Sequence, residues 1–107
     1  MLITFVVREK FDAVEGFSEM TLEDYAAIVH ESNSARNPDE VKTENGLTSM
    51  EYKFYNEQEK ITYKYFTTMF KGDDSFWLVQ FACNENLYEE FKPHFVDWAK
   101  TVDVSAK

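Results

Sequence analysis

Residues 47–83 run as LTSMEYKFY (47–55), NEQEK (56–60), ITYKYFTTMF (61–70), KGDDS (71–75) and FWLVQFAC (76–83). In the first two apolar segments, polar and apolar side chains alternate with the period of a β-strand. The third is apolar at nearly every position, which indicates a central strand buried on both faces. The two polar connections have hairpin length, so an antiparallel meander of three strands is predicted.

The first strand of this meander also predicts how the sheet is covered. Met50, Tyr52 and Phe54 alternate with Glu51 and Lys53, and the second strand continues the pattern. One apolar and one amphipathic face are typical of a sheet that is covered on one side.

Upstream, residues 2–9 are rich in β-branched and aromatic side chains and predict a fourth strand. It either lies at a sheet edge or follows an upstream element that has been lost. Thr21 and Asp24 then have the spacing of a capping box, so a helix is expected to begin there and to end at 31–33. Its expected apolar stripe consists of Leu22, Tyr25, Ala26, Ile28 and Val29.

A second helix is expected from Asn84 or Asn86 to Val102, and Pro93 is expected to kink or split it. Its apolar stripe consists of Leu87, Phe91, Phe95, Trp98 and Val102. The order β-α-β-β-β-α predicts an α+β fold in which two helices cover one antiparallel sheet, in two or three layers. Residues 1–107 are expected to form a single domain, with 32–46 as a flexible acidic loop.

Composition narrows the possible partners. The 107-residue chain has 20 acidic and 11 basic residues, a formal net charge of −9, and 17% aromatic residues. Such a charge repels nucleic acid and anionic lipid surfaces, so neither is an expected partner, whereas a basic protein is a possible one. The N-terminus has no signal-peptide pattern and no stretch is long enough for a membrane span. We therefore expect a cytoplasmic protein, or a cell-envelope lipoprotein if a signal has been removed.

The order of elements resembles a known superfamily. It runs from strand 2–9 to the helix start Thr21-Leu22-Glu23-Asp24-Tyr25, through three aromatic strands, to the closing sequence FKPHFVDW (91–98). In this order the chain is similar to the superfamily that groups the photosystem II subunit PsbP, the Ran-binding Mog protein and bacterial DcrB-like proteins. The resemblance implies a PsbP-like α/β sandwich and a binding or accessory role without enzymatic activity. Members usually begin with an additional N-terminal hairpin, which is absent here.

Candidate chemical groups are few. His30 is expected to stabilise a helix C-terminus, and it lacks a strong metal ligand three or four residues on. His94 and Asp97 have hydrogen-bonding spacing on a helix, but the sequence places no nucleophile beside them. Cys83 ends an apolar strand and is expected to be a small buried hydrophobe, with an activated thiol as the alternative. No catalytic residue, metal ligand or cofactor is therefore predicted, and the acidic pairs are attributed to turns and solvated surfaces.

Aromatic residues supply the remaining candidates. Tyr55, Phe66 and Phe70 lie on the strand face opposite Met50; either a helix covers them, which the two apolar helices favour, or they form an exposed patch. With Asp73 and Asp74 they make up the candidate interaction surface.

Three functional hypotheses remain. The first is a non-enzymatic protein-binding or accessory domain with an acidic surface, with an immunity- or antitoxin-like protein that masks a basic nuclease as a special case. The second is a small-ligand binder with a pocket lined by Tyr63, Tyr65, Phe91 and Trp98. The third is a hydrolase that uses His94. The oligomeric state is not indicated by the sequence.

Overall fold

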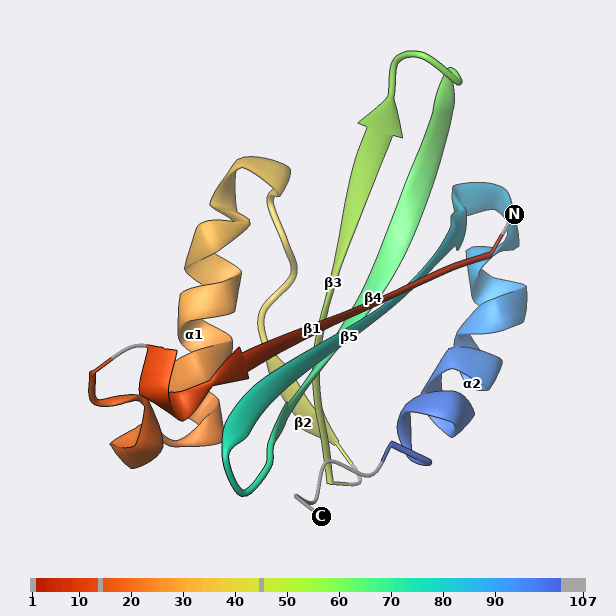
Figure 1. Ribbon diagram of the computed structural model, residues 1–107. Helices are drawn as coiled ribbons and strands as arrows, with labels where there is room; N and C mark the ends of the chain where they lie inside the picture. The colour runs from red at the N-terminus through yellow and green to blue at the C-terminus, as the bar shows by residue number, and fades with distance from the viewer. Residues whose placement is uncertain (1, 14, 45, 103–107) are drawn as a thin grey trace.

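The computed structural model describes residues 2–13, 15–44 and 46–102. Its centre is a five-stranded antiparallel sheet with the strand order β1-β5-β4-β3-β2 (Figure 1). The strands are β1 (Ile3–Lys10), β2 (Lys42–Glu44), β3 (Leu47–Asn56), β4 (Ile61–Lys71) and β5 (Ser75–Asn84). The predicted meander of three antiparallel strands is therefore confirmed as β3-β4-β5, and the N-terminal strand lies at a sheet edge.

Two α-helices cover the sheet, one on each face (Figure 1). Helix α1 (Leu22–Ser32) packs on one side and helix α2 (Tyr88–Ala99) on the other. The α+β class is confirmed. Coverage of the sheet on one side only is wrong, because the alternating side chains of β3 and β4 bring apolar groups to both faces, and each set meets a helix.

Helix α1 begins at the predicted capping box. The Thr21 hydroxyl accepts a hydrogen bond from the Asp24 amide, and the Asp24 carboxylate accepts one from the Thr21 amide. Tyr25, Ala26 and Val29 are buried against the sheet, but Ile28 is exposed, contrary to the expected stripe. Ile28 lies about 200° around the helix from the buried Ala26, so the face that packs Ala26 on the sheet leaves Ile28 exposed.

Helix α2 continues through Pro93 from Tyr88 to Ala99, so the predicted split does not occur. Its buried residues are Tyr88, Phe95 and Ala99, whereas Leu87 and Trp98 are largely exposed. Phe95 is buried and Phe91 and Val102 pack against the same core, as predicted, whereas at Leu87 and Trp98 the neighbouring residues Tyr88 and Ala99 are buried instead. Leu87 belongs to the 3₁₀ helix Glu85–Leu87, and α2 begins only at Tyr88, so Leu87 does not share the buried face of α2.

The α1 side of the sheet has an aromatic core around Phe76. The Tyr25 ring stacks on the Phe76 ring at a centroid distance of 4.4 Å, and Phe11 and Phe17 meet it edge-on at 5.3 and 5.7 Å. Such ring contacts add to the free energy gained by burial. Phe76 thus joins β5, α1 and the turns before α1.

The α2 side has a separate core. Phe66 from β4, Phe81 from β5 and Phe95 from α2 are all buried there, and the Phe81 and Phe95 rings stack at 5.5 Å. The central strands β4 and β5 therefore contribute apolar side chains to both cores, as predicted for residues 76–83.

The segment 32–46 contains regular structure that the sequence pattern did not predict. Residues Ser34–Arg36 form a 3₁₀ helix, and Lys42–Glu44 forms strand β2, which pairs with β3. The Thr43 and Thr48 hydroxyls lie 3.1 Å apart across this pair. The expected order therefore lacked one strand. Flexibility of the segment stays a prediction.

Candidate functional site

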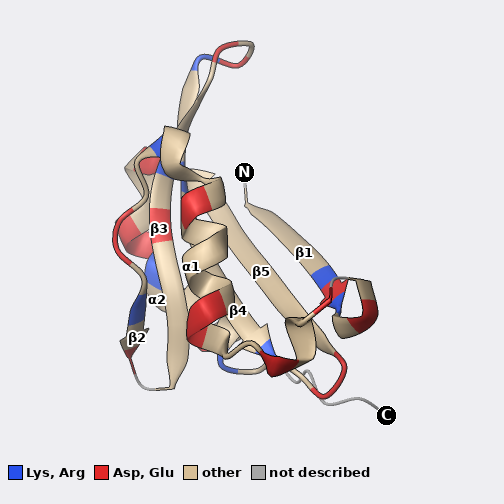
Figure 2. Cartoon of the chain, turned by 90° about the vertical axis from the view of Figure 1, so that its left-hand side faces the viewer, with Lys and Arg blue, Asp and Glu red and all other residues tan. Residues whose placement is uncertain are grey.

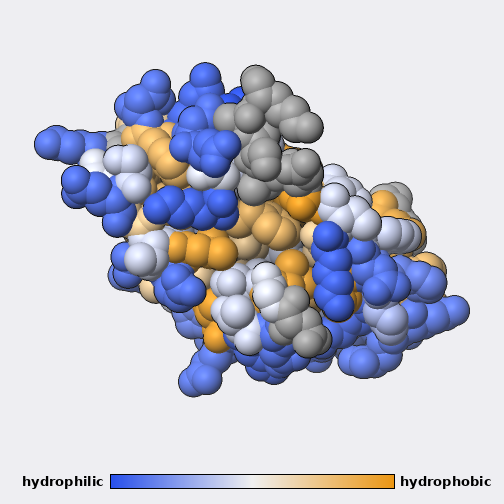
Figure 3. All heavy atoms as spheres, turned by 90° about the horizontal axis from the view of Figure 1, so that it is seen from below, coloured by the Kyte–Doolittle hydropathy of each residue, from blue (hydrophilic) through white to orange (hydrophobic). Residues whose placement is uncertain are grey.

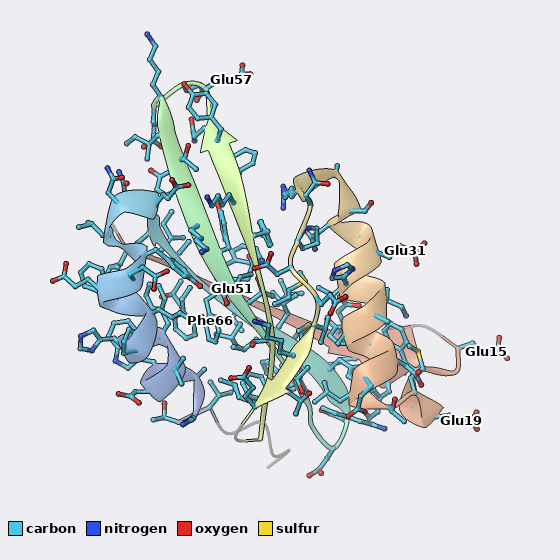
Figure 4. All side chains as sticks on the ribbon, turned by 180° about the vertical axis from the view of Figure 1, so that it is seen from behind. Glu15, Glu19, Glu31, Glu51, Glu57 and Phe66 are labelled. Carbon is cyan, nitrogen blue, oxygen red and sulfur yellow. The ribbon has the colours of Figure 1, made fainter. Side chains whose placement is uncertain are left out.

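The predicted interaction surface is divided between the core and the exterior. Phe66 is only 3% exposed and Phe70 packs against the same core under α2, so neither forms an exposed patch. Figure 4 shows Phe66 in the layer between the sheet and α2. Tyr55 is exposed near the β3–β4 hairpin, while Asp73 and Asp74 are exposed in the β4–β5 turn. Helix α2 covers Phe66 and Phe70, so the favoured alternative, cover by a helix, is correct for these two residues, and their place in the candidate interaction surface is wrong.

Asp74 belongs to a small polar network with β1. Arg8 donates to Asp74 at 2.9 Å and to the Ser75 hydroxyl at 2.9 Å, and Ser75 in turn donates to Asp74. These bonds from Ser75 and Arg8 lower the pKa of Asp74 below its usual value. The network attaches the end of β1 to the β4–β5 turn, which is a structural role.

The predicted aromatic pocket does not form. Tyr63 and Tyr65 lie on the α1 face of β4, and Phe91 and Trp98 belong to α2 on the opposite face. Residues 63 and 65 have the parity of Met69, which packs under α1, whereas Phe66 has the opposite parity and faces α2. A sheet therefore separates the two pairs, and the pocket hypothesis is wrong in this form.

The histidines show no catalytic arrangement. The His94 ring lies 6.0 Å from the Trp98 ring and 6.2 Å from the Phe91 ring. Within the described ranges, His94 and Asp97 form no hydrogen bond, and no group of three His, Cys, Asp or Glu side chains is placed to hold a metal ion. His30 lies in the last turn of α1, as expected for a helix C-terminus.

Cys83 is fully buried in the core under α2. Burial raises the pKa of its thiol, which disfavours the reactive thiolate. Of the two alternatives from the sequence, the small buried hydrophobe fits this position and the activated thiol does not.

A buried polar cluster fixes α2 on the sheet. Glu51 accepts hydrogen bonds from the Tyr88 hydroxyl at 2.6 Å and from Lys92 Nζ at 2.9 Å. Burial raises the pKa of Glu51, but these two bonds, with the charges of Lys92 and Lys64, outweigh it and hold the pKa below its ordinary value. Burial and the bond to Glu51 raise the pKa of Tyr88 strongly. The cluster is a neutral phenol and an ammonium around one carboxylate.

The exterior of α1 and of the turns before it is mainly acidic, although Lys71 of β4 reaches this side and donates to the carbonyl oxygens of Ser18 and Met20. Residues 11–35 contain no Lys or Arg, and their six carboxylates are exposed: Asp12, Glu15, Glu19, Glu23, Asp24 and Glu31. Figure 2, viewed from this side, shows acidic residues along α1 and no basic ones on it. In Figure 4, Glu15, Glu19 and Glu31 point away from the sheet. We call these six residues the acidic face.

A groove lies beside the acidic face. It has a volume of about 420 Å³ between α1 and residues 40–43. Glu23 and Glu40 supply carboxylates, Ala27 and Val41 supply apolar surface, and His30 and Thr43 complete the lining. Carboxylates beside apolar surface suit the long side chains of Lys and Arg, which combine an apolar stem with a charged end.

Neither the acidic face nor the groove was predicted from the sequence. Adjacent acidic pairs do not indicate this face; the informative signal is the 25-residue segment 11–35 without a basic residue. The groove depends on where residues 40–43 run beside α1, which no local pattern indicates.

Comparisons with known proteins give no relative. No protein-family model, no curated protein and no solved structure matches the chain.

Among the residues that the structure describes, no helix has the length and apolar character needed to cross a bilayer.

Proposed function

We propose that the chain is a non-enzymatic protein-binding domain whose acidic face receives a basic partner protein. The observation that carries the proposal is the exposure of six carboxylates over residues 11–35 without an intervening Lys or Arg. We also propose that the domain is of the PsbP/DcrB-like type, on the sequence resemblance given above, with β2 as a strand additional to that order.

The charge distribution supports this role. The net charge of −9 attracts a basic protein at long range and accelerates the encounter at low salt. At short range, the groove between α1 and residues 40–43 offers carboxylates at Glu23 and Glu40 to an inserted Lys or Arg. Seen from below in Figure 3, the apolar areas are interrupted by hydrophilic side chains.

The same surface suits an immunity- or antitoxin-like protein. Such a protein masks a basic nuclease by charge complementarity, and the acidic face offers exposed carboxylates for that contact. If the chain protects cells against a co-expressed basic nuclease and the acidic-face variant described below does not, the result supports the immunity- or antitoxin-like role.

The test compares two variants with equal charge change. The first neutralises the acidic face by Glu19→Gln, Glu23→Gln and Glu31→Gln. The matched control neutralises three exposed acids of α2 by Glu89→Gln, Glu90→Gln and Asp97→Asn. Proteins that the wild-type chain retains from a native lysate are identified and purified. The dissociation constant of each of their complexes with the wild type and with the two variants is then measured at several salt concentrations.

We expect the first variant to weaken binding of the identified partner about tenfold or more, because several charge contacts are removed. The control should bind within about twofold of the wild type, and wild-type binding should weaken as salt rises. Equal loss with both variants, or no retained protein at low or high salt, would contradict the proposal.

A further inference from the structure

The two edges of the sheet differ in length and chemistry. Strand β2, at one edge, has three residues and carries Lys42 and Glu44. Short, charged edge strands resist pairing with other chains. Strand β1, at the other edge, has eight residues, and among the described residues it pairs only with β5. Figure 1 shows β1 in front of the other strands, with no element drawn over it.

The outer edge of β1 combines free backbone groups with exposed apolar side chains. Every second residue of β1 directs its backbone N–H and C=O groups away from β5, towards a side where no described strand pairs with them. Phe5 is 56% exposed and Val6 54% exposed, on opposite faces of the strand, and Leu2 is 46% exposed. Residues 2–7 contain no charged side chain. The usual protection of an edge by charge is therefore missing here.

We infer that β1 docks a second copy of the same chain, edge to edge, as an antiparallel β1–β1 pair around a two-fold axis. The result is a continuous ten-stranded sheet. An isologous pairing of this kind closes at two copies, since each β1 edge is used once. The protected edge at β2 does not compete, because three residues cannot match the length of β1.

The sequence of β1 fits one register of this pair. With Phe5 on the two-fold axis, Ile3 lies opposite the partner copy's Val7 and Thr4 lies opposite its Val6. The charged residues Arg8, Glu9 and Lys10 then lie at the two ends of the pair, beyond the apolar centre. A parallel arrangement would instead place Arg8 against Arg8 and Glu9 against Glu9, which destabilises a strand pair.

The dimer is expected to be weak. A stable interface buries about 1,000 Å² or more in total, and a single pair of eight-residue strands is a small contact by that standard. The expected dissociation constant is therefore on the order of 100 μM.

The symmetry determines the salt dependence. A two-fold axis perpendicular to the sheet places both copies of α1, and thus both acidic faces, on the same side of the continuous sheet. Their repulsion is screened by salt, so the dimer should become tighter as ionic strength rises. Binding of a basic partner should change in the opposite direction, which separates this inference from the proposed function.

Sedimentation equilibrium of the 107-residue chain tests the inference. From about 10 μM to about 1 mM, the average mass should rise from 12.6 kDa towards twice that value. Phe5→Lys should raise the dissociation constant at least tenfold, while Ile28→Lys, at an apolar residue of similar exposure on α1, should leave it within twofold. The circular dichroism and melting temperature of both variants establish that they fold.

Cysteine cross-linking tests the register. Phe5→Cys should form a disulfide-linked dimer under mild oxidation, because residue 5 faces its own symmetry mate. Lys10→Cys should not, because its mate lies about 33 Å away in this register. The inference is overturned by a chain that stays monomeric at 1 mM, by equal loss with Phe5→Lys and Ile28→Lys, or by equal cross-linking of the two cysteines.

Discussion

Tyr88 and Glu51 form a 2.6 Å hydrogen bond that joins helix α2 to strand β3. The donor is a neutral phenol and the acceptor is a carboxylate whose side chain is 13% exposed. A hydrogen bond to a charged group in such surroundings contributes more than one between neutral groups.

We therefore expect Tyr88→Phe to lower the free energy of unfolding by about 1–2 kcal/mol. The ring remains to fill the core, so the change reports the hydroxyl. Urea denaturation measures the loss, and a double-mutant cycle with Glu51→Gln assigns it to this pair. Additive losses in the cycle would show that the two groups do not interact.

The same carboxylate predicts a pH dependence of stability. The pKa of Glu51 is lower in the folded chain than in the unfolded chain, so the folded chain binds fewer protons and stability rises with pH through the unfolded value of about 4.3. The stabilisation by Glu51 is thus complete above that pH and is lost as pH falls below it. The difference in urea midpoint between wild type and Glu51→Gln should shrink between about pH 6 and pH 3. Glu57→Gln, at the exposed hairpin, is the control; an unchanged difference for Glu51→Gln would contradict the assignment.

Phe76 should be among the most sensitive positions of the chain. It is fully buried and contacts the rings of Phe11, Phe17 and Tyr25. Phe76→Ala leaves a cavity and should lower the free energy of unfolding by about 3–5 kcal/mol. Phe54→Ala removes the same side chain at a position that is 39% exposed and should lose less than about 1 kcal/mol. Similar losses at the two positions would show that the α1 side has no such core.

Cys83 should be unreactive in the folded chain. Its thiol is buried and its pKa is raised, so a thiol reagent at pH 8 should modify it only after the chain is unfolded by urea. An exposed cysteine introduced by Lys10→Cys should react at once under the same conditions. Rapid modification of Cys83 without denaturant would contradict its burial.

Local patterns predicted most of the elements. The alternation in 47–55 and 61–70 predicts two strands whose ends agree with those of β3 and β4 to within one residue. The capping box of Thr21 and Asp24 correctly predicts the first residue of α1. These features depend on near neighbours in the chain, where the chemistry of capping and of strand alternation acts directly.

Features set by distant contacts were not predicted. Strand β2 carries Lys42, Thr43 and Glu44, which have low strand preference as a group, and it forms because β3 offers an edge. The candidate pocket failed for a similar reason. The pattern predicts that Tyr63 and Phe91 both face the space between the sheet and the helices, but the two helices lie on opposite faces of the sheet. The sequence of a single element does not indicate which face of the sheet a helix will cover.

Strands β4 and β5 are shared by the two cores, with Met69 and Phe76 on one face and Phe66 and Phe81 on the other. Loss of either helix would therefore hydrate the strands on which the other helix rests. The two layers should melt in a single cooperative transition, and neither half of the molecule should persist as a folded intermediate.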